Sequence, residues 1–278
     1  MTDKIEIFED SVIQHGCSND RIYLIKIAPQ DPIVLIDYAQ DLASSHGYSK
    51  IFAKVPESQL EQFIGKGFIE EARVPKFFSG HEDGYFLGLY RSESRRRESK
   101  KEVLEDIIAV AQNKALETAP VPVLESDFKY RIMQKNDVEQ MAVVYGKVFA
   151  SYPFPIEDPN YLMKTMDEDV VYHGVWHNDE LVALSSAEID FEHSNVEMTD
   201  FATLPEYRSH GLASYLLNKM EKDVQSSGIL TAYTIARAYS YGMNITFAKH
   251  GYKFAGSLTN NTQIFGELES MNVWYRPL

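Results

Sequence analysis

The stretch that decides the fold reads Thr203-Leu204-Pro205-Glu206-Tyr207-Arg208-Ser209-His210-Gly211-Leu212-Ala213-Ser214. It joins a strand-like run, residues 196–203, to an amphipathic helix, and its turn has the pattern Arg-x-x-Gly-x-Ala. Small residues at such a turn let backbone N–H groups approach a phosphate, and the helix dipole favours negative charge there. The turn carries neither the Gly-Lys-Ser/Thr of a nucleoside-triphosphate loop nor the glycine pattern of a dinucleotide site. The sequence therefore predicts a phosphate-binding turn of another kind.

The carboxy-terminal part around this turn alternates strand and helix patterns in a clear order. From residue 128 on, the hydrophobic periodicity predicts the order β-α-α-β-β-β-α-β-α-β-β. Strands are expected near residues 130–133, 170–176, 181–189, 196–203, 230–236, 252–258 and 270–275, and helices near residues 138–149, 160–166, 212–227 and 243–250.

The turn and this order together resemble the GCN5-related N-acetyltransferases, the GNAT superfamily. The resemblance implies an α+β fold with a mixed central sheet flanked by helices, and acetyl-coenzyme A (acetyl-CoA) as co-substrate. It also implies that the turn holds the pyrophosphate, while backbone groups of the preceding strand bind the pantetheine arm. The cofactor-binding residues that it implies are Phe201, Ala202, Thr203, Arg208, Ser209, His210, Gly211, Leu212, Ala213, Ser214 and Asn244.

The amino-terminal part repeats some of this pattern. Helices are expected at residues 35–46 and 58–65, and strands at residues 49–55, 68–77 and 84–90. Lys66-Gly67-Phe68 also matches Lys249-His250-Gly251-Tyr252 in kind and position. No Arg-x-x-Gly-x-Ala turn occurs here, so we expect a smaller α/β domain that resembles a degenerate half of the GNAT fold and binds no cofactor. A chance similarity between common βαβ units is the alternative.

A charged stretch separates the two parts. Residues 92–101 are almost wholly charged or hydroxylic, and an apolar stripe follows at helical spacing, with Val103, Ile107, Ala111 and Ala115. Glu93, Glu98, Glu102 and Glu105 lie around the arginines of residues 95–97 and offset their charge, which favours a solvated helix over a nucleic-acid patch. We expect an amino-terminal domain at residues 1–91, a helical connector at 92–127 and a catalytic domain at 128–278.

Composition narrows the partners. The 41 acidic and 27 basic residues give a formal charge of −14, which repels nucleic acid and anionic membranes and attracts small cationic amines. Acidity that only confers solubility is the plainer reading. Cys17 is the single cysteine, and neither an apolar signal region nor a membrane-span pattern occurs, so a cytoplasmic protein is expected. The sequence leaves the oligomeric state unknown.

Transfer of an acetyl group to an amine requires a residue that attracts the ammonium and removes its proton. Glu197 and Asp200 lie on the strand that leads into the turn, on opposite faces unless a bulge intervenes. By the resemblance, Glu197 is the general base, directly or through water; an exposed strand glutamate, or one that only binds substrate charge, is the alternative. Asp200 is the second candidate for the base, and we expect it to bind the substrate ammonium. Many relatives protonate the leaving thiolate with a tyrosine where this chain has Phe247, so we expect Tyr241 to replace it, with Tyr239 or water as alternatives.

Aromatic residues mark the expected acceptor groove. Tyr152 and Phe154 follow the first predicted helix of the catalytic domain, where the resemblance gives them a substrate-binding role, and packing is the alternative. No metal is expected, because His173 and His177 lie on a predicted strand and turn without an evident third ligand.

Within the superfamily, three segments resemble the β-lysine N-acetyltransferases. They are residues 197–208, 241–245 and 269–275, which read EMTDFATLPEYR, YGMNI and ESMNVWY. This narrower resemblance implies acetylation of the side-chain amine of β-lysine, giving Nε-acetyl-β-lysine, a compatible solute used in osmoadaptation. Lysine, ornithine and polyamines stay open as acceptors. A protein-lysine acetyltransferase and a sensor that binds acetyl-CoA without catalysis are the rival functions.

Overall fold

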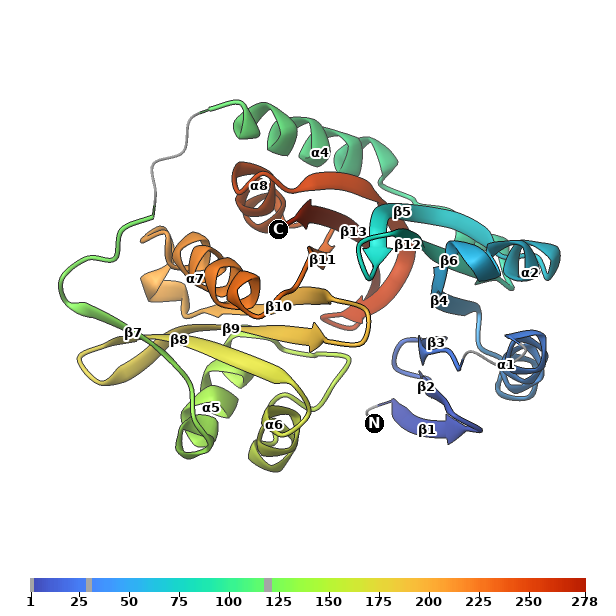
Figure 1. The fold of residues 1–278 in the computed structure, drawn as a ribbon, viewed down its shortest axis with the longest axis horizontal. Coiled ribbons are helices and arrows are strands. Elements are labelled where there is room, and N and C mark those ends of the chain that lie inside the picture. Colours follow the sequence, from blue (N-terminus) through green and yellow to red (C-terminus); the bar gives the residue numbers. More distant parts are fainter. Residues whose placement is uncertain (1–2, 29–31, 118–121) are drawn as a thin grey trace.

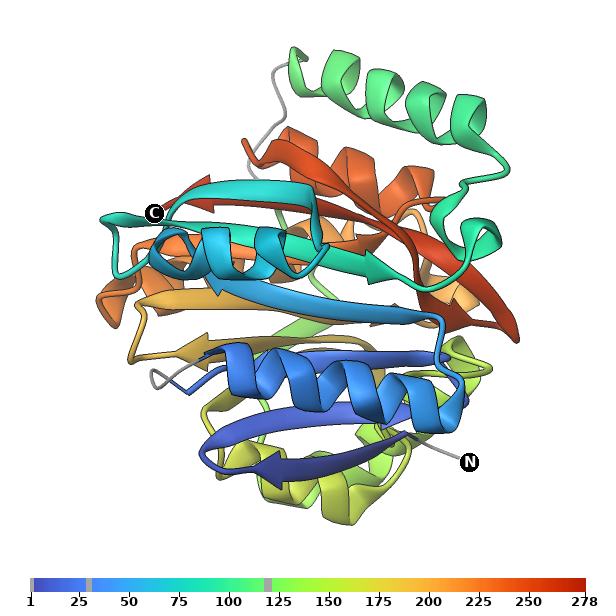
Figure 2. The same ribbon diagram turned by 90° about the vertical axis from the view of Figure 1, so that its right-hand side faces the viewer.

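The structure, a computed structural model, describes residues 3–28, 32–117 and 122–278. Over these residues the strands form a single sheet of 13 strands, in the order β1-β2-β3-β4-β6-β5-β12-β13-β11-β10-β9-β8-β7. Helices cover parts of the sheet on both faces (Figure 1), and the turned view shows the amino-terminal strands beside the carboxy-terminal ones (Figure 2). None of the helices in the described ranges is both long enough and apolar enough to span a membrane.

The amino-terminal half begins with three strands that the sequence did not predict. Its elements are β1 (Lys4–Phe8), β2 (Ser11–Gly16), β3 (Arg21–Lys26), α1 (Pro32–His46), β4 (Lys50–Pro56), η1 (Glu57–Gln59), α2 (Leu60–Gly65), β5 (Ile69–Phe78) and β6 (Glu82–Tyr90). Strand β2 buries Gln14 and His15 directly after Ile13. Polar residues on a buried stretch break the alternation that reveals a half-buried strand.

The carboxy-terminal half follows the predicted order. Its elements are β7 (Phe128–Ile132), η2 (Lys135–Asp137), α5 (Val138–Val148), α6 (Pro159–Met166), β8 (Val170–His177), β9 (Glu180–Asp190), β10 (Asn195–Thr203), η3 (Pro205–Tyr207), α7 (Leu212–Ser226), β11 (Thr231–Arg237), α8 (Tyr241–Lys249), β12 (Lys253–Ile264) and β13 (Glu267–Pro277). Helices α5 and α6 lie on one face of β8 and β9, and α7 lies on the other (Figure 1).

The two halves share one topology. Strands β1 to β6 have the spatial order 1-2-3-4-6-5, and strands β8 to β13 have the order 8-9-10-11-13-12. Strands β3 and β4 run parallel on either side of α1 in the chain, as β10 and β11 do on either side of α7. The amino-terminal half thus has the topology of the GNAT core without counterparts of β7, α5 and α6. The sheet is continuous, so the proposed boundaries at residues 91 and 127 stay predictions.

The connector packs on the carboxy-terminal half. It holds α3 (Glu93–Arg96) and α4 (Lys101–Ala115), and residues 118–121 of the predicted connector lie outside the described ranges. Leu104 and Ile107 are buried against Ala238, and Ala111 is buried in the cluster that contains Phe247. The predicted apolar stripe therefore covers the side of α8, while its residue Val103 faces solvent.

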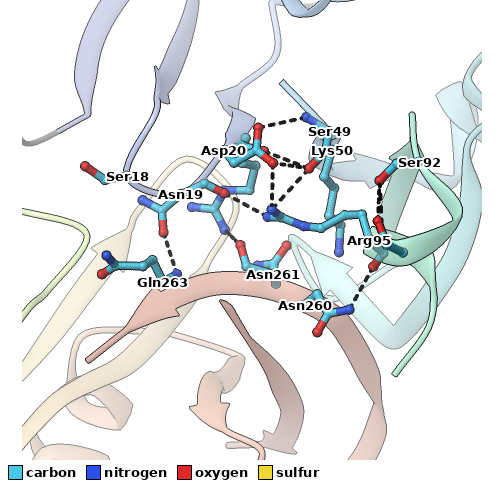
Figure 3. A network of polar contacts seen from close by, with 12 residues as sticks. Ser18, Asn19, Asp20, Ser49, Lys50, Ser92, Arg95, Asn260, Asn261 and Gln263 are labelled. Carbon is cyan, nitrogen blue, oxygen red and sulfur yellow. Dashed lines mark hydrogen bonds and ion pairs between the residues drawn. The ribbon is translucent and has the colours of Figure 1, made fainter. Parts of the chain in front are cut away.

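The halves join where β5 meets β12. Gly256 on β12 is paired with Ala72 on β5, and a Cβ atom at Gly256 would stand 2.1 Å from the backbone oxygen of Glu71. Close approach of two backbones thus requires glycine here. A polar network closes the same junction (Figure 3): the backbone N–H of Gln263 donates to Asn19, and Arg95 donates to the carbonyl of Asn19.

Candidate active site

Strands β10 and β11 separate in the middle of the sheet. They pair in parallel only from Asn195 to Glu197, opposite Thr231 to Tyr233, although β10 continues to Thr203. Past Glu197, one edge of β10 therefore has no partner strand within the described residues. This edge, which includes Phe201, Ala202 and Thr203, is where the sequence predicts an extended ligand between the strands, while the opposite edge of β10 stays paired with β9.

The predicted phosphate turn lies at the end of this opening. After η3, Ser209 and Gly211 both have left-handed backbone conformations, with φ of 74° and 72°, and α7 starts at Leu212. The first amides of an α-helix have no partner within the helix, so those of Leu212, Ala213 and Ser214 are free to meet an anion. The geometry fits a pyrophosphate on backbone N–H groups, as the sequence predicts.

Several side chains of the turn contact other residues of the chain. Arg208 is exposed and donates from Nε to the carbonyl of Thr203 at 3.4 Å. His210 contacts the carboxylate of Glu125 at 3.1 Å, and Ser214 contacts His250 at 2.7 Å. Their roles in cofactor binding stay predictions.

Three carboxylates gather beside the opening. Glu197 on β10 lies directly opposite Glu188 on β9 in the antiparallel register. A bulge between Thr199 and Ala202, where Asp200 has φ of 53°, changes the register of β10. As a result Asp200 lines the same cavity as Glu188 and Glu197, a cavity of about 210 Å³. The bulge that the sequence left as a condition is therefore present.

Burial changes the protonation of this cluster. It raises the pKa of Glu188, Glu197 and Asp200 above their usual values, because a carboxylate loses its hydration there. Like charges raise the pKa of Glu188 further, whereas the nearby ammonium of Lys54 and a hydrogen bond from Tyr233 oppose the effect at Glu197. Interacting acids of this kind share their protons, so the cluster accepts a proton more readily than exposed carboxylates do.

Asp200 is the most firmly held of the three. Ser186 donates to one carboxylate oxygen at 2.7 Å, and the hydroxyl of Tyr152 donates to the other. Tyr152 and Phe154 both line the cavity, at the loop that follows α5. The structure thus brings the predicted substrate residues Asp200, Tyr152 and Phe154 together.

The amino-terminal half forms another wall of the cavity. Arg21 and Tyr23 come from β3, and Phe52 and Lys54 come from β4. Lys54 donates from Nζ to the hydroxyl of Tyr233 on β11 at 2.8 Å. The half that lacks a phosphate turn therefore contributes charged side chains to the candidate acceptor site.

The predicted general acid does not reach this cavity. Tyr241 begins α8 with 43% of its surface exposed, and its hydroxyl donates to Asp106 on α4 at 2.6 Å. Tyr239 likewise donates to Glu98 of the connector. Both hydroxyls point to the connector because α4 packs along α8, a contact that the sequence did not reveal. Phe247, at the position where many relatives have the tyrosine, lines the cavity and is fully buried. Its side chain has no hydroxyl and cannot donate a proton.

Asn244 is also placed differently from the prediction. It is fully buried, and its Nδ2 donates to the carbonyls of Arg237 and Ser240 at 3.0 and 2.7 Å. Its Oδ1 accepts from Asn272 and Trp274 at 2.9 and 2.8 Å. An amide has two donor hydrogens and one acceptor oxygen, and all are used. Asn244 therefore fixes α8 against β11 and β13 and has no group left for pantetheine.

Sequence reasoning missed Glu188, Arg21, Lys54 and Tyr233. Glu188 lies at the end of the predicted strand 181–189, and antiparallel pairing of that strand with the predicted strand 196–203 would have placed it opposite Glu197. No local signal identifies Arg21 or Lys54, because both reach the cavity only through the pairing of the two halves.

Comparisons with known proteins agree with this geometry. The model of the acetyltransferase (GNAT) family matches residues 139–252. A β-lysine N(6)-acetyltransferase of Methanococcus maripaludis is 41% identical over 99% of this chain and 98% of that protein. The N-acetyltransferase YodP of Bacillus subtilis is 34% identical, covering 96% of each chain. A β-lysine N(6)-acetyltransferase of Methanosarcina mazei is 29% identical over 85% of this chain and 94% of that protein. The Methanococcus relative is 41% identical over nearly the whole chain, and the fold has the separated strands and the predicted phosphate turn. The chain therefore belongs to the GNAT family of acetyltransferases.

Proposed function

We propose that this enzyme transfers the acetyl group of acetyl-CoA to the side-chain amine of β-lysine, giving Nε-acetyl-β-lysine. The observation that carries the proposal is the buried cluster of Glu188, Glu197 and Asp200 beside the opening between β10 and β11. Such a cluster suits a small acceptor with more than one ammonium group. The full-length relative that acts on β-lysine supports the choice of amine.

Acetyl-CoA supplies the activated thioester carbonyl in this family. In our proposal its pyrophosphate meets the backbone N–H groups between Ser209 and Ser214, and its pantetheine arm meets the free edge of β10. Gly211 keeps that backbone accessible, since no atom lies within 4 Å of where its Cβ would stand. These contacts hold the thioester of acetyl-CoA near Glu197, because β10 carries both Glu197 and the edge that meets the pantetheine arm.

The acceptor must lose a proton before it can attack. An alkyl ammonium has a pKa of about 10.4, so only about one molecule in 2,500 is neutral at pH 7, a handicap of about 4.6 kcal/mol. Glu197 accepts this proton, directly or through water, and its raised pKa brings its basicity closer to the working pH. Asp200 and Glu188 hold the ammonium groups, and the bonds from Tyr152 and Ser186 keep Asp200 in place.

Thiol release from acetyl-CoA tests the proposal directly. The purified chain is assayed with β-lysine, lysine, ornithine, spermidine and a lysine-rich peptide, and the product is located by mass spectrometry and NMR. We expect the highest kcat/KM with β-lysine and acetylation at its ε-amine. A preference for the peptide would instead identify a protein acetyltransferase. Binding of acetyl-CoA without transfer to any amine would favour a sensor.

A further inference from the structure

Three basic side chains line the cavity, and two of them already face acidic groups. Arg237 forms a two-pronged ion pair with Glu269, with nitrogen–oxygen distances of 3.0 and 2.8 Å. Lys54 donates to Tyr233, and its positive charge acts on Glu197. The third is Arg21, at the start of β3, and its surroundings differ.

Arg21 is 4% exposed and has only neutral partners. Its guanidinium donates to the carbonyl of Asn261 at 2.7 Å, to Thr262 Oγ1 at 3.3 Å and to Gln14 Oε1 at 3.5 Å. Within residues 3–28, 32–117 and 122–278, no carboxylate forms an ion pair with it. Buried charges in proteins are normally paired, so this guanidinium is unusual.

The two carboxylates whose charges act on Arg21 are Asp3 and Glu71, and both have other partners. Asp3 accepts from the backbone of Ser18 and from Asn19, and Glu71 is paired with Lys50 at 2.8 Å. Burial consequently lowers the pKa of Arg21 to about 10. An anion that entered the cavity would find a desolvated, fork-shaped donor, which matches a carboxylate in geometry.

A second unpaired group lies beside Arg21. Asn261 is 1% exposed and lines the cavity, and its Oδ1 accepts no hydrogen bond from the described residues. Figure 3 shows Asn261 on β12, at the junction with the amino-terminal half. A buried acceptor without a donor is rare in folded proteins, so Asn261 Oδ1 is available to a donor group of a ligand at this end of the cavity.

We infer that Arg21 and Asn261 bind the carboxylate end of the acceptor, with the guanidinium on the carboxylate and Asn261 Oδ1 on the neighbouring ammonium. The inference rests on the proposed function and adds the selection of an amino acid over a polyamine. The acids on β9 and β10 face the amines, and the amino-terminal half contributes the opposite charge through β3. The amino-terminal half, which has no phosphate turn, thereby has a role in acceptor specificity.

Pairs of acceptors that differ by one group test the inference. Removal of the carboxylate from β-lysine gives 1,4-diaminopentane, and removal of its β-amine gives 6-aminohexanoate. Lysine with 1,5-diaminopentane and ornithine with 1,4-diaminobutane are equivalent pairs. For the wild type we expect a higher kcat/KM for the carboxylated member of each pair that is used.

The variant Arg21→Met should remove this preference. A hydrogen bond to a charged group is worth about 1.5–3 kcal/mol, so kcat/KM for β-lysine should fall about 10- to 100-fold, mainly through KM. The value for 1,4-diaminopentane should hardly change, while 6-aminohexanoate should lose as much as β-lysine. The ratio within a pair is independent of the folded fraction, and Arg21→Lys, which keeps the charge, should retain part of the preference if Arg21→Met folds poorly.

The matched control is Arg73→Met, which removes an arginine of the same half that forms an exposed ion pair with Asp83. It should leave every ratio unchanged. Equal losses on both members of a pair in Arg21→Met would overturn the inference and make Arg21 structural. A wild type that ignores β-lysine but prefers lysine over 1,5-diaminopentane would overturn the choice of β-lysine and leave the carboxylate subsite standing.

Discussion

Glu197 differs from an ordinary strand glutamate in what surrounds it. Glu188 lies opposite it, Asp200 is brought beside it by a bulge, and Lys54 approaches from the other half of the chain. Burial raises the pKa of Glu197, and the ammonium of Lys54 with hydrogen bonds from Tyr233 and the backbone of Ile235 limits that rise. A carboxylate in these surroundings is a stronger base than an exposed glutamate, which suits removal of a proton from an amine.

The substitution Glu197→Gln should lower kcat/KM for β-lysine about 10²- to 10⁴-fold near pH 7, the usual range for a general base. In the wild type, activity should rise with pH as Glu197 loses its proton, at a pH above the usual range of a glutamate because its pKa is raised. The deficit of the variant should shrink toward the pKa of the amine, where free amine becomes abundant. Initial rates from pH 6 to 10 measure both effects.

The control for this series is Glu105→Gln, an exposed glutamate on α4 that pairs with Lys101. It should follow the wild type at every pH. A loss in Glu197→Gln that stays constant across the pH range would identify Glu197 as a substrate anchor and leave the proton to Asp200 or water.

At the scale of elements, the site depends on β10 and on the turn that follows it. Strand β10 separates from β11 past Glu197, and the chain then reaches α7 through two left-handed residues. Gly211 is the second of them, at φ of 72°, with open space around its Cβ position. Its conformation therefore favours glycine more than its packing does.

Gly211→Asp should weaken acetyl-CoA binding about 100-fold or more, since like-charge juxtaposition costs several kcal/mol. Gly211→Asn is the matched control, because asparagine has the same shape, tolerates the left-handed conformation and carries no charge. It should stay within about tenfold of the wild type. Calorimetric titration with acetyl-CoA measures both Kd values. Equal affinities in the two folded variants would place the pyrophosphate elsewhere.

The elements themselves were predictable where local patterns are strong. The order from β7 to β13 and the turn at Arg208 to Ser214 were predicted from periodicity and small residues. Strands β1 to β3 were missed, because buried polar residues such as Gln14 and Arg21 hide their alternation. Tyr241 and Asn244 were misplaced because their partners, Asp106 and Trp274, come from other elements.

At the scale of the whole molecule, the two similar halves share a single sheet, and residues of both line one cavity. The junction is held by a buried ion pair: Lys50 on β4 lies 2.8 Å from Glu71 on β5, and its Nζ also donates to the carbonyl of Thr259 on β12 at 2.9 Å. Both charged side chains are almost fully buried. Arg21 and Lys54 line the cavity from the amino-terminal half, so their positions depend on this junction.

Lys50→Met should lower the free energy of unfolding by about 3–5 kcal/mol, because it leaves the carboxylate of Glu71 buried without its partner. The double variant Lys50→Met/Glu71→Leu should recover much of that loss. Urea denaturation followed by circular dichroism gives the three stabilities. If Lys50→Met alone were as stable as the wild type, the ion pair would not hold the junction.

A crystal structure of the chain with coenzyme A and β-lysine examines the shared site in one measurement. We predict the ε-amine beside Glu197, toward the opening between β10 and β11, and the carboxylate within hydrogen-bond distance of the guanidinium of Arg21. Coenzyme A should place its pyrophosphate on the turn from Ser209 to Ser214. β-Lysine bound with its carboxylate in solvent, or outside the cavity between the two halves, would contradict the assignment.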